Sequence, residues 1–186
     1  LNIKGTIFMP LTTPKQKVDQ VRMFGRNNVE IILTGDTFDD SAAAATDYCE
    51  EHEMIFIHPF NDLDIIAGQG TVAVEVLNDI EVPVDFIFGG IGGGGLMSGI
   101  AAYMKNISPN TKVIGVEPDG AASMKAAFEN GGPVLLEKID KFCDGTAVQM
   151  VGQSTYEICR KYLDDIITIP EGKVSTTILD LYNKHA

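Results

Sequence analysis

Apolar positions along the chain follow two alternating patterns, which predict strands and helices in turn. Short runs rich in β-branched residues predict strands at residues 3–9, 29–33, 55–57, 84–88, 113–116 and 166–169. Apolar residues at helical spacing predict helices at residues 14–25, 38–52, 65–77, 96–106, 122–129, 154–162 and from 174 onward. This alternation is typical of an α/β protein with parallel sheets that helices cover on both faces.

Two local signals set boundaries within this pattern. Thr13 followed by Pro14 predicts the start of the first helix, with Thr13 as N-cap and Pro14 as the first helical residue. The turn residues from Pro59 to Asp62 interrupt the alternation of strands and helices. We therefore expect a domain edge there, between residues 1–60 and residues 61–186.

Composition narrows the class of protein. The chain of 186 residues is 45% hydrophobic and 22% charged, which is ordinary for a globular protein and argues against disorder. Its formal net charge of -12, without a cluster of Lys or Arg, argues against nucleic acid and anionic membranes as partners. No apolar run is long enough to span a bilayer, and the N-terminus lacks the pattern of a signal peptide. We expect a cytoplasmic protein with a small-molecule partner.

The three cysteines do not form a recognisable framework. Cys49, Cys143 and Cys159 are odd in number and widely spaced, with no C-x-x-C pair. This spacing argues against both a disulfide framework and a zinc site. We expect three reduced, buried thiols.

The most informative segment runs from Phe88 to Leu96, where an apolar strand leads through consecutive glycines directly into a helix. Glycines let backbone amides approach an anion without obstruction by Cβ, and a helix N-terminus adds unpaired donors and partial positive charge. Four adjacent glycines also carry an entropic cost that a simple turn does not require. The segment therefore predicts a phosphate-binding loop.

The pattern of residues leaves the kind of phosphate open. Gly90, Gly92 and Gly95 also satisfy the G-x-G-x-x-G pattern of dinucleotide-binding folds. Glu117 ends the next predicted strand, where such folds keep the acid that binds the ribose. Motif spacing alone therefore permits a nicotinamide-binding Rossmann module, and a purely structural piece without a ligand is a third possibility.

Several separated stretches together resemble one enzyme family. They are Thr6–Pro10 with Pro14–Val21, His58–Asn61, Ile66–Thr71 (IAGQGT), Gly92–Leu96 (GGGGL), Val116–Pro118, Asp144–Gly145 and Leu163–Ile166. In order and spacing they resemble fold-type II pyridoxal-phosphate enzymes, whose fold is like that of the tryptophan synthase β subunit. Within this family they resemble the branch of threonine and serine dehydratases and serine racemases. Phe60, Asn61 and residues 139–145 are most similar to biosynthetic threonine dehydratases.

The resemblance implies a cofactor, a site and a reaction. The phosphate of pyridoxal 5'-phosphate would rest on Gly92, Gly93, Gly94, Gly95 and the amide of Leu96, with Gly145 near the pyridine ring. Residues 1–60 would belong to the small subdomain and residues 61–186 to the large, cofactor-binding subdomain. The intact enzyme would deaminate L-threonine to 2-oxobutanoate and ammonia in isoleucine biosynthesis, as a homo-oligomer. Serine dehydratase or racemase activity is the alternative within the family.

The same resemblance implies that the chain is an internal fragment. The family's catalytic lysine lies in an S-x-K-x-R-G-A motif and its substrate loop in S-x-G-N, and both would precede this chain. None of its eleven lysines stands in such a motif. The serine that contacts the pyridine nitrogen would follow Ala186. We therefore expect no catalytic residue here, and no activity from the chain alone.

The remaining candidates for a metal or catalytic site are Glu117 with Ser123, a cluster of three aspartates, and the histidines. Glu117 and Ser123 fall near positions that hold a divalent cation in serine racemases, but Ser123 stands where an acid is expected. The sequence therefore assigns no metal site and favours a capping or surface role. Asp36, Asp39 and Asp40 resemble a helix-start cluster. The three histidines lack the spacing of metal ligands.

Overall fold

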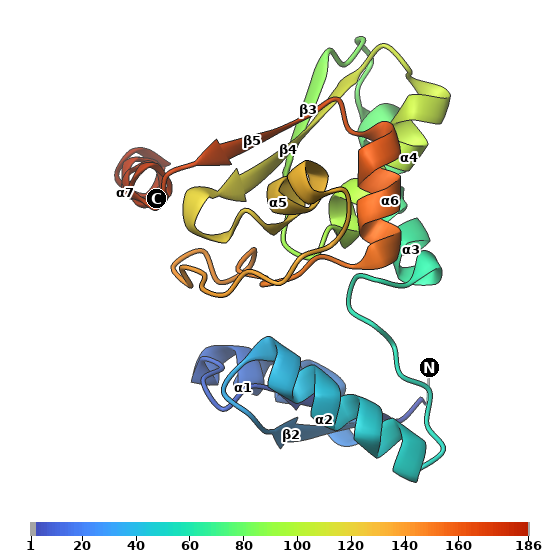
Figure 1. The fold of residues 1–186 in the computed structure, drawn as a ribbon, viewed down its shortest axis with the longest axis vertical. Coiled ribbons are helices and arrows are strands. Elements are labelled where there is room, and N and C mark those ends of the chain that lie inside the picture. Colours follow the sequence, from blue (N-terminus) through green and yellow to red (C-terminus); the bar gives the residue numbers. More distant parts are fainter. Residues whose placement is uncertain (1–2, 186) are drawn as a thin grey trace. The chain divides into compact units, whose positions relative to one another are not determined.

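The computed structural model describes residues 3–185, except for the side chains of Asp39 and His185. The chain divides into two compact units, one ending at Ile57 and the other beginning at His58 (Figure 1). Each unit contains its own parallel sheet. Among the described residues, no helix combines the length and apolar character needed to cross a membrane.

The first unit is built from two parallel strands and two helices. Its elements are β1 (Gly5–Met9), α1 (Lys15–Gly25), the 3-10 turn η1 (Arg26–Asn28), β2 (Val29–Leu33) and α2 (Phe38–Glu51). Gly5 pairs with Val29 and Met9 with Leu33 across the two strands. The predicted start of α1 is wrong by one residue. Pro14 itself is the N-cap and no side chain caps the helix, because the chain turns at residues 11–13 before the helix begins.

The acidic cluster Asp36, Asp39 and Asp40 does mark a helix start, that of α2. Thr37 is the N-cap, and its hydroxyl accepts a hydrogen bond from the Asp40 amide at 3.1 Å. The Asp40 carboxylate in return accepts from the Thr37 amide at 3.0 Å, which completes a capping box. The strand predicted at residues 55–57 is absent. Ile55 and Ile57 are largely exposed and have no strand beside them, and a lone extended segment leaves its ladder hydrogen bonds unmade.

The second unit contains a sheet of three parallel strands in the order β3-β4-β5. Its elements are α3 (Leu63–Asp79), β3 (Phe86–Gly90), α4 (Gly95–Ile107), β4 (Lys112–Pro118), the 3-10 turn η2 (Asp119–Ala121), α5 (Ser123–Asn130), α6 (Gln153–Tyr162), β5 (Asp165–Ile169) and α7 (Glu171–His185). The helix α4 packs against β3 and β4 and lies next to both α3 and α6 (Figure 1).

Helices cover one face of this sheet, not both as expected. The strands follow one another across the sheet in chain order, and right-handed crossovers then place every connecting helix on the same side. That side holds the core, with Met97, Met104 and Met124 fully buried. On the other side Phe86 and Phe88 stack on each other with their rings 5.9 Å apart, and both are more than half exposed.

The contact between α3 and α4 depends on glycine. A Cβ on Gly99 of α4 would lie 2.4 Å from the Ile66 carbonyl oxygen and 2.5 Å from the Gly70 nitrogen, both in the backbone of α3. These distances are far shorter than real Cβ contacts, so the two helices can approach this closely only without a side chain at Gly99. By contrast, a Cβ on Gly68 of the same helix α3 would meet nothing within 4 Å.

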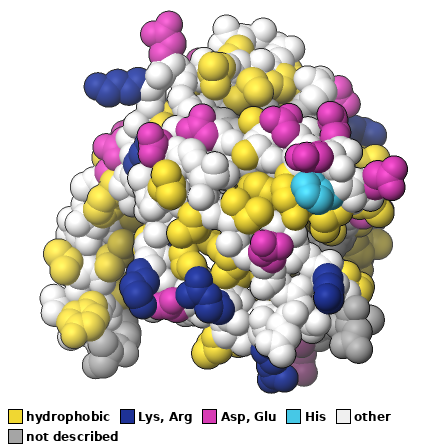
Figure 2. Space-filling model, turned by 90° about the horizontal axis from the view of Figure 1, so that it is seen from below, with side chains coloured by type: hydrophobic (Ala, Val, Ile, Leu, Met, Phe, Trp, Pro, Cys, Tyr) yellow, Lys and Arg dark blue, Asp and Glu magenta, His cyan; other side chains and the backbone are white. Residues whose placement is uncertain are grey.

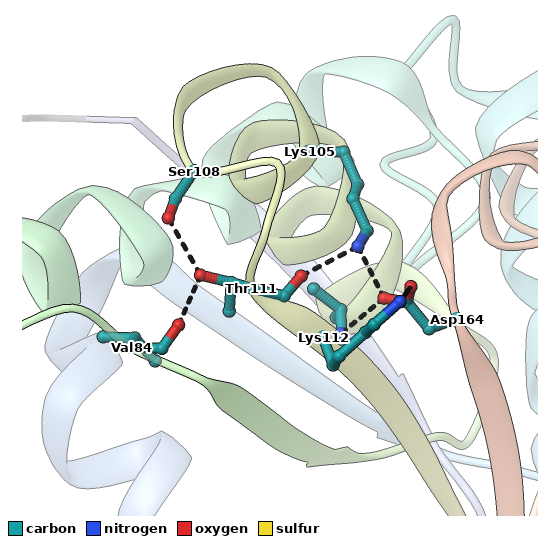
Figure 3. A network of polar contacts seen from close by, with 7 residues as sticks. Val84, Lys105, Ser108, Thr111, Lys112 and Asp164 are labelled. Atoms are coloured by element: carbon teal, nitrogen blue, oxygen red, sulfur yellow. Dashed lines mark hydrogen bonds and ion pairs between the residues drawn. The ribbon is translucent and has the colours of Figure 1, made fainter.

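A polar network ties the amino ends of the three strands together (Figure 3). The Asp164 carboxylate, just before β5, pairs with Lys105 at 2.6 Å and with Lys112 at 3.0 Å, and accepts from the Val113 amide at 2.8 Å. The Thr111 hydroxyl donates to the carbonyl of Val84 at 2.7 Å. Burial alone would raise the pKa of Asp164, but its three partners together hold that pKa down at about 2.

Charged side chains on the surface are mixed in sign. Over the face shown in Figure 2, basic side chains are interspersed with acidic ones and do not gather into a patch. The chain as a whole carries 26 acidic against 14 basic residues.

We expect Gly99→Ala to lower the free energy of unfolding by about 1–3 kcal/mol, because the added methyl group collides with the backbone of α3. Gly68→Ala is the matched control, and we expect it to raise that free energy by about 0.5–1 kcal/mol by removing backbone freedom from the unfolded chain. Urea unfolding of both variants measures the difference. Equal effects at the two positions would contradict the close approach of α3 and α4.

The lowered pKa of Asp164 predicts a dependence of stability on acid. Because the folded pKa of about 2 lies below the ordinary 3.8, the stabilisation is present above 3.8 and is lost as the pH falls towards 2. We expect it to reach about 1–2 kcal/mol after discounting for partial exposure. Asp164→Asn should remove this part of the pH dependence in urea unfolding from pH 5 to pH 2. Asp165→Asn, one residue away, should leave it unchanged.

Candidate functional site

The candidate site lies at the carboxyl edge of the three-stranded sheet, opposite the Asp164 network. The strands β3, β4 and β5 end there at Gly90, Pro118 and Ile169. In open parallel sheets, ligands bind outside the carboxyl ends of the strands because the loops that follow the strands converge at that edge. The glycine loop between β3 and α4 is one of these loops.

The amides of the glycine loop are available to an anion. Within residues 3–185, no hydrogen bond has the amide of Gly92, Gly93, Gly94, Gly95 or Leu96 as its donor. Gly94 is the N-cap of α4, and its φ of 95° places it in the left-handed region that favours glycine. The loop therefore presents successive free amides at the start of a 13-residue helix, where the helix dipole also favours negative charge.

Glycine is needed in this loop because neighbouring side chains leave no room for a Cβ, quite apart from any bound anion. A Cβ on Gly93 would lie 2.3 Å from ring carbons of Phe60, and one on Gly94 would lie 2.6 Å from Cε of Met124. A substitution such as Gly94→Asp, which the phosphate interpretation alone would suggest as a clean test of binding, would therefore also disturb the core. Leu96 is a better position for a substitution. Its side chain is 37% exposed, so that replacing it need not displace the loop backbone.

A short turn ahead of α3 places Phe60 on the glycine loop. The Nδ1 atom of His58 accepts hydrogen bonds from the amides of Phe60 at 3.2 Å and Asn61 at 2.9 Å. Burial lowers the pKa of His58, although the nearby Asp62 acts in the opposite direction, so the neutral ring that can accept is favoured. His58 therefore shapes the turn, a role that its position in the sequence did not indicate.

Asn61 extends the same turn to α6. Its side-chain oxygen accepts from the Ser154 amide at 2.9 Å, in the first turn of that helix. A Cβ on Gly152, the N-cap of α6, would collide with the Asn61 side chain. The turn therefore links the start of α6 to the segment that packs on the glycine loop.

Buried polar side chains on α4 and α6 hold the inner side of the loop. The Thr155 hydroxyl donates to the carbonyl of Gly93 at 2.6 Å, and the Ser98 hydroxyl lies 3.3 Å from the Cys159 sulfur. Burial raises the pKa of Cys159 to about 12, so its thiol stays protonated, 4.0 Å from the Gly94 carbonyl oxygen. Local sequence pattern does not reveal this contact, because Thr155 is separated from Gly93 by 62 residues.

Gly145 lies beside the start of the loop. A Cβ on Gly92 would stand 3.4 Å from the Gly145 carbonyl oxygen, so the structure brings together the two ends of the predicted cofactor site. Gly145 also lines a mostly apolar hollow of about 370 Å³ at the carboxyl ends of the strands, with Pro118, Ile169 and Ile178. None of the residues Gly92–Leu96 lines this hollow, and Gly145 connects it to the loop. A ligand with a phosphate and an apolar ring would suit the loop and the hollow together.

The carboxylate of Glu117 is not available to bind a ribose. It is 1% exposed, and its two carboxylate oxygens accept from the amides of Met124 at 2.8 Å and Lys125 at 2.9 Å. Burial raises the pKa of Glu117, and these two amides oppose that rise. Glu117 therefore caps α5. The Ser123 hydroxyl is buried without a partner in the described part of the chain, where no His, Cys, Asp and Glu cluster suited to a metal occurs.

The cysteines agree only in part with expectation. All three are free thiols, but only Cys159 is buried, whereas Cys49 and Cys143 are half-buried. Cys49 lies in the exposed last turns of α2, and Cys143 lies in the irregular segment that precedes α6. Apolar character alone does not decide burial, because it depends on which elements pack against the residue.

The comparisons with known proteins identify the class. All 186 residues match the family of pyridoxal-phosphate dependent enzymes, and the chain therefore belongs to that family. The chain is 59% identical to the biosynthetic L-threonine dehydratase IlvA of Halalkalibacterium halodurans and 55% identical to that of Bacillus subtilis. Both alignments cover the whole chain but only 45% and 44% of the relatives, so the chain spans about half their length.

Solved structures give the same fold. Threonine deaminase isoform 2 from Solanum lycopersicum superposes with a TM-score of 0.90 at 38% identity, over 99% of this chain and 52% of that one. Maize serine racemase superposes with a TM-score of 0.88 at 29% identity, over 97% of this chain and 53% of that one. The predicted fold class is therefore confirmed as that of fold-type II pyridoxal-phosphate enzymes.

Proposed function

We propose that this chain holds the phosphate of pyridoxal 5'-phosphate on Gly92–Leu96 in an L-threonine dehydratase. The observation that carries the proposal is the row of amides without acceptors at the start of α4. Such amides fit a phosphate because each donates to a charged oxygen, which makes hydrogen bonds stronger than those between neutral groups. Gly145 and the adjoining hollow would then lie on the side of the cofactor ring.

The reaction assigned to the whole enzyme is the conversion of L-threonine to 2-oxobutanoate and ammonia. When bound, pyridoxal phosphate supplies an electron sink for chemistry at the substrate's Cα. The residues described here position that group and do not themselves react. Identities of 52–59% to biosynthetic threonine dehydratases, against 29% to maize serine racemase, support threonine over serine as substrate.

The environment of Glu117 argues against the alternative of a nicotinamide-binding module. A dinucleotide-binding module needs an acid free to bind the ribose, whereas both oxygens of Glu117 are already engaged at the start of α5. The match of the whole chain to pyridoxal-phosphate dependent enzymes argues in the same direction. A single phosphate group is therefore the proposed anion.

We expect Leu96→Asp to weaken phosphate binding about tenfold or more, because a carboxylate in the first turn of α4 repels the anion that the free amides attract. An acid is favourable at this helical position, so the fold should persist. The measurement is an amide NMR titration of the 186-residue chain with inorganic phosphate and with pyridoxal phosphate.

The matched control is Leu96→Asn, which has nearly the same shape as Leu96→Asp and no charge. We expect it to bind phosphate within about threefold of the parent chain, because the donors are backbone groups. If the responding amides of the parent lie outside Gly92–Leu96, or if both variants bind equally, this loop is not the phosphate anchor.

We also expect that the 186-residue chain alone does not turn over threonine. None of its eleven lysines stands in the S-x-K-x-R-G-A motif, and Lys105 and Lys112 are paired with Asp164 at the opposite edge of the sheet. Removal of such a group typically costs several orders of magnitude in rate. The assay measures 2-oxobutanoate with added pyridoxal phosphate, beside a complete dehydratase at equal concentration, and any production above the blank would refute the expectation.

A further inference from the structure

Thr155 makes a contact with the glycine loop that its own burial does not require. It lies in α6, is fully buried, and its hydroxyl stands 2.6 Å from the Gly93 carbonyl oxygen and 3.0 Å from the Gly152 carbonyl oxygen. A threonine hydroxyl has one proton to donate, and the Gly152 carbonyl three residues earlier would satisfy it locally. The shorter contact goes to Gly93, in a segment remote in sequence.

This contact fixes the direction of one peptide group. The peptide between Gly93 and Gly94 is trans, so its carbonyl and its amide point in opposite directions. When the Gly93 carbonyl points at Thr155, the Gly94 amide must point away from Thr155, and it has no acceptor within residues 3–185. The hydroxyl on the inner side thus determines a donor on the outer side.

This peptide is limited in space by Phe60 and Met124, but within residues 3–185 its only hydrogen bond is the one from Thr155. It is flanked by glycine on both sides, and glycine populates positive and negative φ about equally, so the peptide plane can rotate at small cost. Gly95 and Leu96 differ because their amides belong to the first turn of α4 and are directed by the helix itself. The Gly94 amide is therefore the donor that depends on Thr155.

We propose that Thr155 is a positioning residue for the phosphate site, whose hydroxyl holds the Gly93–Gly94 peptide with the Gly94 amide turned to the anion. The proposal rests on the proposed function, since it assumes that this loop binds a phosphate. Thr155 touches neither phosphate nor substrate and acts through the loop backbone. A purely structural role would affect stability alone.

The test compares three variants of the 186-residue chain by amide NMR titration with inorganic phosphate. Thr155→Val removes the hydroxyl while keeping the shape, and we expect about ten- to a hundredfold weaker binding from the loss of one charge-assisted donor. Its Gly94 amide should no longer shift with phosphate, whereas those of Gly95 and Leu96 still should. Thr155→Ser retains the hydroxyl and should bind within about threefold of the parent.

The matched control is Thr111→Val, which removes another fully buried hydroxyl that donates to a backbone carbonyl, at the opposite edge of the same sheet. We expect it to lower the melting temperature about as much as Thr155→Val does and to leave phosphate binding unchanged. Equal phosphate binding by the two valine variants, or failure of serine to restore binding, would overturn the role of Thr155.

The parent chain alone also tests the proposal if Thr155→Val does not fold. A titration in which Gly95 and Leu96 respond but Gly94 does not would overturn the role of Thr155 and leave the phosphate loop intact. A titration in which none of the loop amides responds would overturn the proposed function itself, and the role of Thr155 with it.

Discussion

The candidate site depends on how closely other parts of the second unit approach the backbone of the glycine loop. Phe60 lies against Gly93, Met124 lies against Gly94, and Thr155 donates to the Gly93 carbonyl. These contacts restrict the backbone of the loop on its inner side. Because the carbonyls on the inner side have partners, the amides on the outer side are left free as a group.

The two edges of the three-stranded sheet have separate tasks. At the amino edge, Asp164 forms ion pairs with Lys105 and Lys112 and accepts a hydrogen bond from the Val113 amide. At the carboxyl edge, the loops leave donors without acceptors beside an apolar hollow. Donors left without acceptors cost free energy until a ligand binds them, whereas the groups at the amino edge already have their partners.

The glycines and Glu117 show how one sequence pattern can carry two meanings. The G-x-G-x-x-G spacing and an acid after the next strand are shared with dinucleotide-binding folds. In the structure, neighbouring side chains crowd Gly93 and Gly94, which lie between the glycines of that pattern, and the acid caps α5. Spacing alone did not distinguish these uses, because it says nothing about which way a carboxylate turns.

By itself the sequence determined the order of strands and helices, the capped start of α2 and the position of the glycine loop, because local spacing and turn residues decide these features. It did not determine that residues 55–57 lack a partner strand, or that helices cover a single face of the larger sheet. The contribution of Thr155 to the loop also required the tertiary structure. Each of these depends on residues distant in the chain meeting in space, which local pattern does not encode.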